Sequence, residues 1–168
     1  MKIQINDLLI SSKKNFEYFL ELDDVKALSI DGREVRFNSP PRISIKITKD
    51  IADELYANVD IAMNVNINCV RCLDDMNVDT TINISGKLVD SDKFSEEDVI
   101  LITNKELDTK EILEDAAFEL LNDNLYCDAS CKGLCQTCGA NLNHKNCNCD
   151  AVGVKIDPRL EKLKDFLN

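Results

Sequence analysis

Apolar and polar residues alternate with a period of two in four stretches of the first ninety residues. Because successive side chains of a β-strand point to opposite faces of the sheet, this alternation predicts strands with one buried face. We therefore expect an α+β fold whose body is a mainly antiparallel, barrel-like sheet. The alternating positions run from Phe16 to Leu22, from Ile43 to Ile47, from Ile61 to Ile67 and from Val78 to Ile84.

One amphipathic helix is predicted after these strands, over residues 108–122. Asp108 followed by Glu111 resembles a capping box with Asp in place of Ser or Thr. An apolar stripe with helical spacing follows this pair and would pack the helix against the sheet. Residues 1–126 are therefore interpreted as a β-rich body with one packed helix. The stripe consists of Ile112, Leu113, Ala116, Ala117, Leu120 and Leu121.

The remaining residues, 127–168, form a tail of different composition. A short helix is predicted to begin at Asp157-Pro158, because proline is favoured at the first helical position. Between residues 127 and 153 there are too few apolar side chains to pack on their own. Another interaction must order this segment. The buried side of the short helix would consist of Leu160, Leu163 and Leu167.

Cysteines are the most informative residues in the composition. Thiols in the cytosol are kept reduced, so clustered cysteines there are better explained as metal ligands than as disulfides. Eight soft thiolates complete two tetrahedral sites, and zinc suits such ligands. We therefore predict two structural zinc ions that stabilise the tail. The predicted ligands are Cys69, Cys72, Cys127, Cys131, Cys135, Cys138, Cys147 and Cys149.

Cys69 and Cys72 form a CxxC motif at the tip of a predicted hairpin. The strand ending at Ile67 keeps its odd-numbered residues on one face, and Cys69 continues that parity, so both sulfurs can turn toward one ion. A thiol-disulfide redox pair is the main alternative. It is disfavoured because a nucleophilic cysteine usually lies at a helix N-terminus, whereas the setting here is β. Two inert cysteines in a strand and turn are a further alternative.

The other six cysteines all lie in the tail, where two groupings remain open. Gly139, directly after Cys138, can adopt positive φ and let backbone N–H groups point at a sulfur. His144, the only histidine, could replace a cysteine as ligand, although a loop histidine is more often solvated. The first grouping closes one site from Cys135, Cys138, Cys147 and Cys149, and a second from Cys69, Cys72, Cys127 and Cys131. The alternative unites Cys127, Cys131, Cys135 and Cys138 and leaves the other two pairs to join.

Negative charge is concentrated in the body. Residues 1–126 carry 14 basic and 26 acidic residues, whereas residues 127–168 carry 6 and 5. An acidic body repels polyphosphate, which disfavours nucleic-acid binding there and makes a zinc-ribbon regulator of DNA a weaker alternative. RNA contact, if present, is expected from the tail. Its basic residues are Lys132, Lys145, Lys155, Arg159, Lys162 and Lys164.

Several function classes lack their sequence signals. No stretch approaches the roughly 20 apolar residues of a membrane span, and the first residues have no signal-peptide pattern, so we expect a cytoplasmic protein. No P-loop or GxGxxG motif occurs. The single histidine lies among the tail cysteines, which leaves no Ser-His-Asp set. Closed four-thiolate sites are structural rather than catalytic. We therefore expect that the protein is not an enzyme.

The motifs of the hairpin and the tail resemble the Gram-positive-type YceD family. The run Cys69-Val70-Arg71-Cys72-Leu73 matches the CxRCL motif of that family. The runs from Cys131 to Asn143, Cys147-x-Cys149 and from Asp157 to Lys164 match its tail in order and spacing. One departure lies in residues 120–126, which lack the proline that family members usually carry before the first tail cysteine.

The resemblance implies a non-enzymatic ribosome-biogenesis factor that promotes accumulation of 23S ribosomal RNA and assembly of the large ribosomal subunit. The implied partners are the large-subunit precursor, its ribosomal proteins and 23S rRNA, with no membrane involved. Some relatives lack the later tail cysteines but keep the CxxC. This implies a first metal site that joins the hairpin to the early tail and a second that is optional. The acidic body favours basic ribosomal proteins as contacts.

Overall fold

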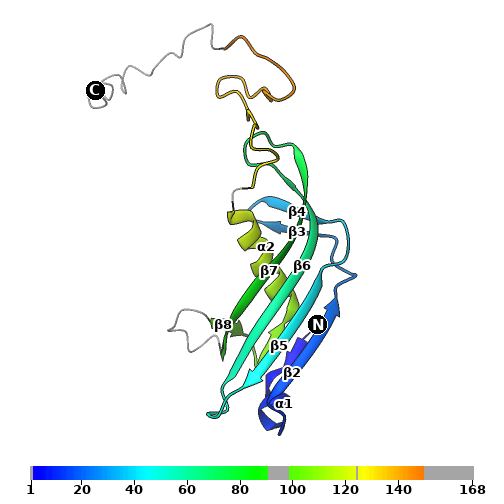
Figure 1. The fold of residues 1–168 in the computed structure, drawn as a ribbon, viewed down its shortest axis with the longest axis vertical. Coiled ribbons are helices and arrows are strands. Elements are labelled where there is room, and N and C mark those ends of the chain that lie inside the picture. The colour runs from blue at the N-terminus through cyan, green and yellow to red at the C-terminus, as the bar shows by residue number, and fades with distance from the viewer. Residues whose placement is uncertain (1, 91–98, 124, 150–168) are drawn as a thin grey trace, which may run out of the picture. The chain divides into compact units, whose positions relative to one another are not determined.

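The part of the chain that the structure describes contains nine strands and two helices (Figure 1). The structure is a computed structural model and describes residues 2–90, 99–123 and 125–149. The short helix predicted at Asp157 lies outside these residues. The elements are β1 (Lys2–Gln4), α1 (Ile5–Ile10), β2 (Asn15–Glu21), β3 (Ala27–Ile30), β4 (Arg33–Phe37), β5 (Arg42–Lys49), β6 (Leu55–Asn68), β7 (Asp75–Asp90), β8 (Val99–Ile102), β9 (Glu106–Asp108) and α2 (Thr109–Asn122).

The long strand β6 is the centre of a seven-stranded sheet. It pairs antiparallel with β5, β4 and β7; β2 extends the sheet from β5, β3 extends it from β4, and β8 runs parallel to β7. The α+β class and the mainly antiparallel body are therefore confirmed. The barrel is wrong: among the described residues no strand pairing closes the sheet.

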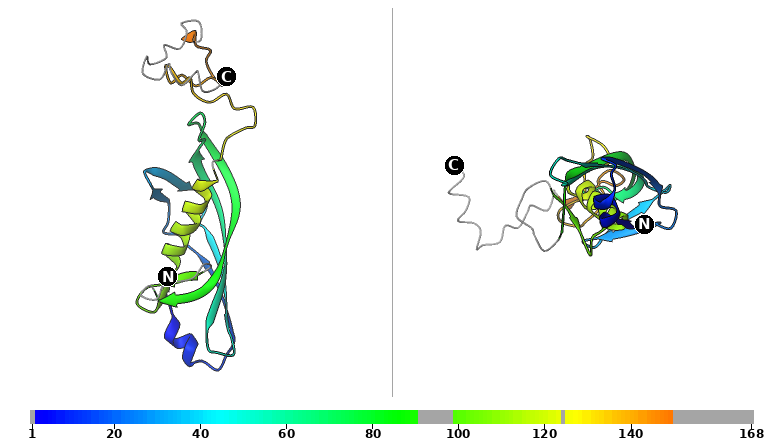
Figure 2. Two further views of the ribbon diagram at one scale, coloured as in Figure 1. Left: turned by 90° about the vertical axis from the view of Figure 1, so that its left-hand side faces the viewer. Right: turned by 90° about the horizontal axis from the view of Figure 1, so that it is seen from below.

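Helix α2 explains why the sheet stays open. It lies along the concave face of the sheet (Figure 2) and packs its apolar stripe into the core, with Leu113, Ala116 and Ala117 almost fully buried. The space that a closed barrel would enclose is thus filled by a helix. The prediction of this helix is confirmed. Asp108 is its N-cap and accepts a hydrogen bond from the backbone N–H of Lys110 at 2.9 Å.

The core contains the residues that alternation predicted on β5 and β6, together with residues of α2 and of strands that alternation missed, such as Val35 and Leu107. Odd-numbered residues of β6 are buried and even-numbered residues are not. On β5 the side chains of Ile43, Ile45 and Ile47 are buried in the same layer. The strongest evidence for the predicted register is therefore the burial pattern itself, because a slip of one residue would expose every one of these side chains.

Replacing Ile45 by alanine should lower the free energy of unfolding by about 2–5 kcal/mol, since Ile45 is 0% exposed and its removal leaves a cavity. Ile51→Ala is the matched control, because Ile51 is 98% exposed. The control should change the stability by less than about 0.5 kcal/mol. Urea unfolding of both variants measures the difference. Equal effects of the two changes would contradict the assigned core.

The chain divides into two compact units. The body unit contains the sheet and α2, up to Leu125. The cysteine unit joins the β6–β7 connection, Cys69–Asp74, to the described residues from Tyr126 onward. Within the described part of the cysteine unit the buried residues are three cysteines and a glycine, with no buried aliphatic or aromatic side chain. These residues are Cys69, Cys72, Gly133 and Cys135.

Candidate metal centre

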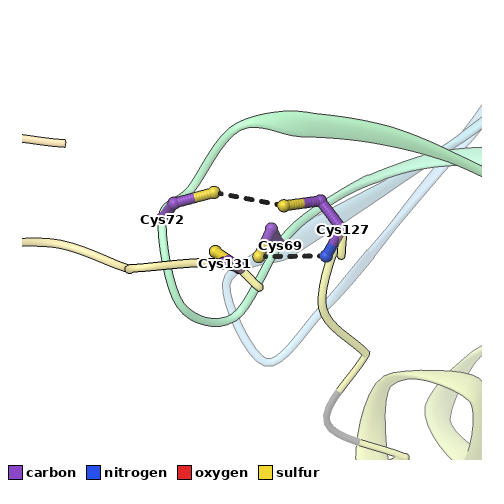
Figure 3. A group of neighbouring side chains, drawn as sticks. All are labelled: Cys69, Cys72, Cys127 and Cys131. Atoms are coloured by element: carbon purple, nitrogen blue, oxygen red, sulfur yellow. Dashed lines mark hydrogen bonds between the residues drawn. The ribbon is translucent and has the colours of Figure 1, made fainter. Parts of the chain in front are cut away.

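The eight cysteines form two groups of four, and the sulfur atoms of each group all lie within 4.8 Å of one another. All eight are free thiols. The structure therefore has the first of the two groupings that the sequence left open. The first group, drawn in Figure 3, is Cys69, Cys72, Cys127 and Cys131. The second group is Cys135, Cys138, Cys147 and Cys149.

The spacing of the sulfurs suits a tetrahedral ion. Metal–sulfur bonds of about 2.3 Å give a tetrahedron with edges of roughly 3.8 Å. The sulfurs of Cys72 and Cys127 lie 3.7 Å apart in the first group. A soft divalent ion could therefore be held by these groups with little movement of the chain.

The Cys69 turn directs backbone N–H groups at its sulfur. The N–H of Arg71 lies 3.4 Å from Cys69 Sγ, and the N–H of Cys127 donates to the same sulfur at 3.3 Å. Two backbone bonds close the turn, from Leu73 N–H to Cys69 O at 3.0 Å and from Cys69 N–H to Asp74 O at 2.8 Å. These donors stabilise a thiolate, which is the ligand form of cysteine.

The Cys135 turn repeats this geometry at equivalent positions. The N–H of Thr137 lies 3.4 Å from Cys135 Sγ, the N–H of Gly139 donates to Cys135 O, and the N–H of Cys135 donates to Ala140 O, both at 2.8 Å. Positive φ occurs at the same place in both turns, at Leu73 (64°) and at Gly139 (72°). The positive φ expected for Gly139 is confirmed, while the first turn places leucine in this conformation.

Substitution of the residue with positive φ should change the ion affinity of the two turns in opposite directions. Left-handed backbone costs a residue with a side chain about 1–2 kcal/mol, so Leu73→Gly should strengthen ion binding at the first group by about fivefold and Gly139→Ala should weaken it at the second by a similar factor. Competition with a chromophoric chelator, with zinc as the probe ion, measures both. Gly32→Ala is the control, because Gly32 has φ 76° in the body unit. A change of the same sign in both turns would contradict the assignment.

The cysteines of one group differ in their affinity for protons. Burial alone would raise the pKa of Cys69, but the backbone N–H groups of Cys127, Cys72 and Arg71 lower its pKa to about 6. The backbone N–H of Asp74 would lower the pKa of Cys72, but burial and the neighbouring sulfurs raise it to about 12. One sulfur of the group is thus ionised at neutral pH and suppresses ionisation of a neighbour.

The second group follows the same pattern. The backbone N–H groups of Cys138 and Thr137 lower the pKa of Cys135 to about 6. The sulfur of Cys138, followed by burial and the other two sulfurs, raises the pKa of Cys149 to about 12. Each metal-free group therefore contains at least one cysteine that is ionised above about pH 6.

Ion binding should strengthen as pH rises. An ion that takes four thiolates must displace every proton still bound, and above about pH 6 one cysteine of each group has already lost its proton. Binding should therefore release no more than three protons per ion at pH 7, and a fourth only below about pH 6. Zinc affinity measured across this range by chelator competition gives the slope. An affinity independent of pH would contradict thiolate ligation.

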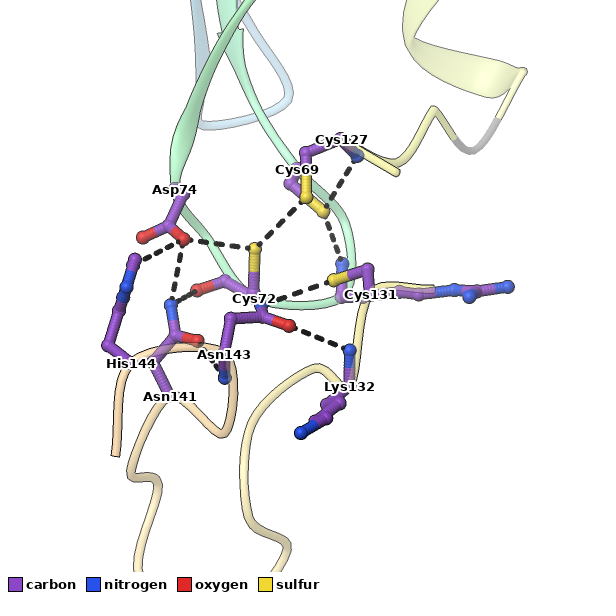
Figure 4. A network of polar contacts seen from close by, with 10 residues as sticks. Cys69, Cys72, Asp74, Cys127, Cys131, Lys132, Asn141, Asn143 and His144 are labelled. Carbon is purple, nitrogen blue, oxygen red and sulfur yellow. Dashed lines mark hydrogen bonds and ion pairs between the residues drawn. The ribbon is translucent and has the colours of Figure 1, made fainter. Parts of the chain in front are cut away.

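Polar side chains around Asp74 tie the hairpin tip to the tail within the cysteine unit (Figure 4). The carboxylate of Asp74 accepts from Asn141 Nδ2 at 3.0 Å and lies 2.9 Å from His144 Nε2 and 3.4 Å from Cys72 Sγ. Donation by Asn141, followed by Cys72 and His144, lowers the pKa of Asp74. His144 therefore lies beside a carboxylate and belongs to neither group of four sulfurs.

Asn143 continues this network to the first group. Its Nδ2 lies 3.4 Å from Cys131 Sγ, and its Oδ1 accepts from the backbone N–H of Lys132 at 2.8 Å. This side chain is the leading cause of the lowered pKa of Cys131. Reasoning from cysteine spacing missed Asp74, Asn141 and Asn143. The sequence signal for these residues was the dense run of asparagines between the CxxC motif that ends at Cys138 and the CxC motif that begins at Cys147.

Comparison with known proteins agrees with the motifs that form these groups. The sequence profile of the family described as "Large ribosomal RNA subunit accumulation protein YceD" matches residues 57–167. A relative from Arabidopsis thaliana, "Large ribosomal RNA subunit accumulation protein YCED homolog 1, chloroplastic", is 40% identical over 45 residues, 27% of this chain and 14% of that protein. No solved structure matches the chain significantly. Because the profile covers the hairpin, helix α2 and both cysteine groups, the chain belongs to the YceD family.

Proposed function

We propose that this protein is a non-enzymatic factor that promotes accumulation of 23S rRNA and assembly of the large ribosomal subunit. The family match over residues 57–167 carries the proposal. The printed name of the chloroplast relative supports the same role, although the chain matches only 14% of that protein's length.

We propose that each of the two groups of sulfurs binds one zinc ion. Four thiolates favour zinc over the hard ions magnesium and calcium, which prefer oxygen ligands. The proposed role of the ions is structural, since the described part of the cysteine unit buries no aliphatic or aromatic side chain. Residues 69, 72, 127 and 131 would hold one ion, and residues 135, 138, 147 and 149 the other.

A structural role for the ions also favours a protein without catalysis. Four thiolates would occupy every position of a tetrahedral ion and leave none for water or substrate.

The protein would work in the cytoplasm, where its ribosomal partners are assembled. In the described residues no helix has the length and apolar character needed to cross a membrane. The net charge of −11 favours basic ribosomal proteins over RNA as direct contacts.

Depletion in the native organism, followed by sucrose-gradient profiling, tests the proposed function. Loss of the protein should reduce free large subunits and 23S rRNA while 16S rRNA is maintained. Re-expression of the normal chain should restore the profile, whereas Cys72→Ser should not. Ala129→Ser, a change at an exposed tail position, is the matched control and should restore it. Unchanged large-subunit and 23S levels on depletion would refute the proposal.

A thiol-disulfide activity of Cys69 and Cys72 is a second candidate, and the pKa of Cys69 near 6 favours it. The burial of Cys69, which is 0% exposed, opposes attack on an external disulfide. This candidate predicts disulfide exchange of the metal-free protein with a chromogenic disulfide, and suppression of the reaction by bound zinc. Absence of exchange in the metal-free protein would refute it.

A further inference from the structure

A groove in the body unit lies between β8 and the first turns of α2. Its volume is about 290 Å³. Ile100 of β8 and Ile112 of α2 contribute apolar surface, and both side chains are otherwise buried in the core. Leu101, which is 45% exposed, adds an accessible aliphatic side chain at the strand. Strand β8 therefore offers apolar surface on both of its faces, with Ile100 on the side of α2 and Leu101 on the opposite side.

One wall of the groove carries carboxylates that form no salt bridge among the described residues, although Lys2 attracts Glu111 at longer range. Glu111, Glu114 and Asp115 line it from α2, and the structure records no ion pair for them among the described residues. Partial desolvation, with the charge of Glu114, raises the pKa of Asp115. A positively charged ligand would relieve this repulsion. Asp108, the fourth carboxylate of the groove, caps α2 and lies 3.9 Å from Lys2.

The strand that borders the groove has an open edge. β8 pairs with β7 on one side, and no other described strand pairs with Val99–Ile102 (Figure 1). An edge strand presents unpaired N–H and C=O groups to an extended chain. Strand β8 and the groove together thus offer backbone hydrogen bonds, apolar surface and negative charge to one extended segment.

We propose that this groove binds an extended segment of a basic protein, rich in lysine or arginine and with apolar residues at alternate positions, as a strand added to β8. Alternate side chains of such a strand would point to opposite faces, the basic set toward the carboxylates of α2 and the apolar set toward the face of β8 that carries the exposed Leu101. RNA is excluded as the occupant by like charge. The inference rests on the groove alone and stands apart from the proposed role in ribosome assembly.

Fluorescence anisotropy of the full chain with a short fluorescein-labelled peptide that alternates lysine and valine tests the proposal. The groove variant is the triple change Glu111→Gln, Glu114→Gln and Asp115→Asn. The control, Glu17→Gln, Asp23→Asn and Asp31→Asn, removes the same charge from exposed positions elsewhere in the body unit. Amide NMR of each protein shows that it is folded and where the peptide binds.

We expect the groove variant to bind the peptide about tenfold more weakly and the control to stay within about twofold of the normal chain. Peptide-induced shifts should fall on β8 and α2, and a peptide that alternates glutamate and valine should not bind. Equal weakening in both triple variants, or shifts confined to other strands, would overturn the proposal. Direct binding of labelled single-stranded RNA to the protein, with amide shifts on β8 and α2, would also overturn it.

Discussion

Removal of divalent ions is expected to unfold the cysteine unit while the sheet and α2 remain folded. The described part of this unit buries only cysteines and one glycine, so little apolar burial opposes its unfolding. Structural zinc contributes roughly 10–16 kcal/mol to the folding of comparable small sites at neutral pH. The body unit keeps its own core, which includes Val59 and Ile61 at 0% exposure.

Amide NMR under reducing conditions, before and after addition of a strong chelator, measures this effect. Signals of residues 69–74 and 126–149 should lose dispersion, whereas signals of β5 and of the first half of β6 should not shift. Addition of zinc should restore the spectrum. A cysteine unit that stays ordered without metal, or that contains no metal when purified, would refute structural coordination.

Zinc content should be two ions per chain, and one in each of the variants Cys72→Ser and Cys149→Ser. Each change removes a ligand from a different group of four sulfurs, and loss of one thiolate from a closed site lowers zinc affinity severely. Metal analysis of the purified proteins measures the ratio. Ala129→Ser, which introduces the same side chain at an exposed tail position, should keep both ions.

The double variant Cys72→Ser, Cys149→Ser separates the two groupings. In the grouping of the structure these residues belong to different sites, so the double variant should contain no ion. In the alternative grouping both residues would serve the same site, and the double variant would keep one ion. One ion in the double variant would therefore contradict the assigned sites.

Alternation of apolar residues predicted β2, β5, β6 and β7, because their side chains point in turn to a more buried and a more exposed face. It missed β3 and β4, although Asp31-Gly32 between them is a strong signal for a two-residue hairpin turn. The structure has φ 49° at Asp31 and 76° at Gly32. The strands themselves are short, with Val35 the one residue of β4 that is buried, so their pattern is weak.

Closure of the sheet was not predictable from local patterns. Whether β2 and β8 pair depends on what fills the concave face of the sheet. Helix α2 fills it, and its contacts with the sheet join residues far apart in sequence. The parallel pairing of β7 with β8 was likewise not predicted from the sequence.

For the candidate metal centre, the sequence predicted which residues are the ligands and on which face of the strand the first of them lies. The sequence predicted that Cys69 continues the parity of the strand ending at Ile67, and in the structure Cys69 directly follows β6 and is 0% exposed. Spacing left the grouping open because it does not define the path of the tail. The contacts of Asp74 with Asn141 and His144 join residues 67 and 70 positions apart, and neither motif contains information about them.

The separation between the two halves of the first cysteine group has a consequence for synthesis of the chain. Cys72 and Cys127 are 55 residues apart, and a ribosome that adds about 5–20 residues per second needs roughly 3–11 s to make that stretch. During this interval the nascent hairpin has two thiols without their partners. Premature oxidation or capture of another ion would then trap it, so these two thiols must stay reduced until Cys127 and Cys131 have been made.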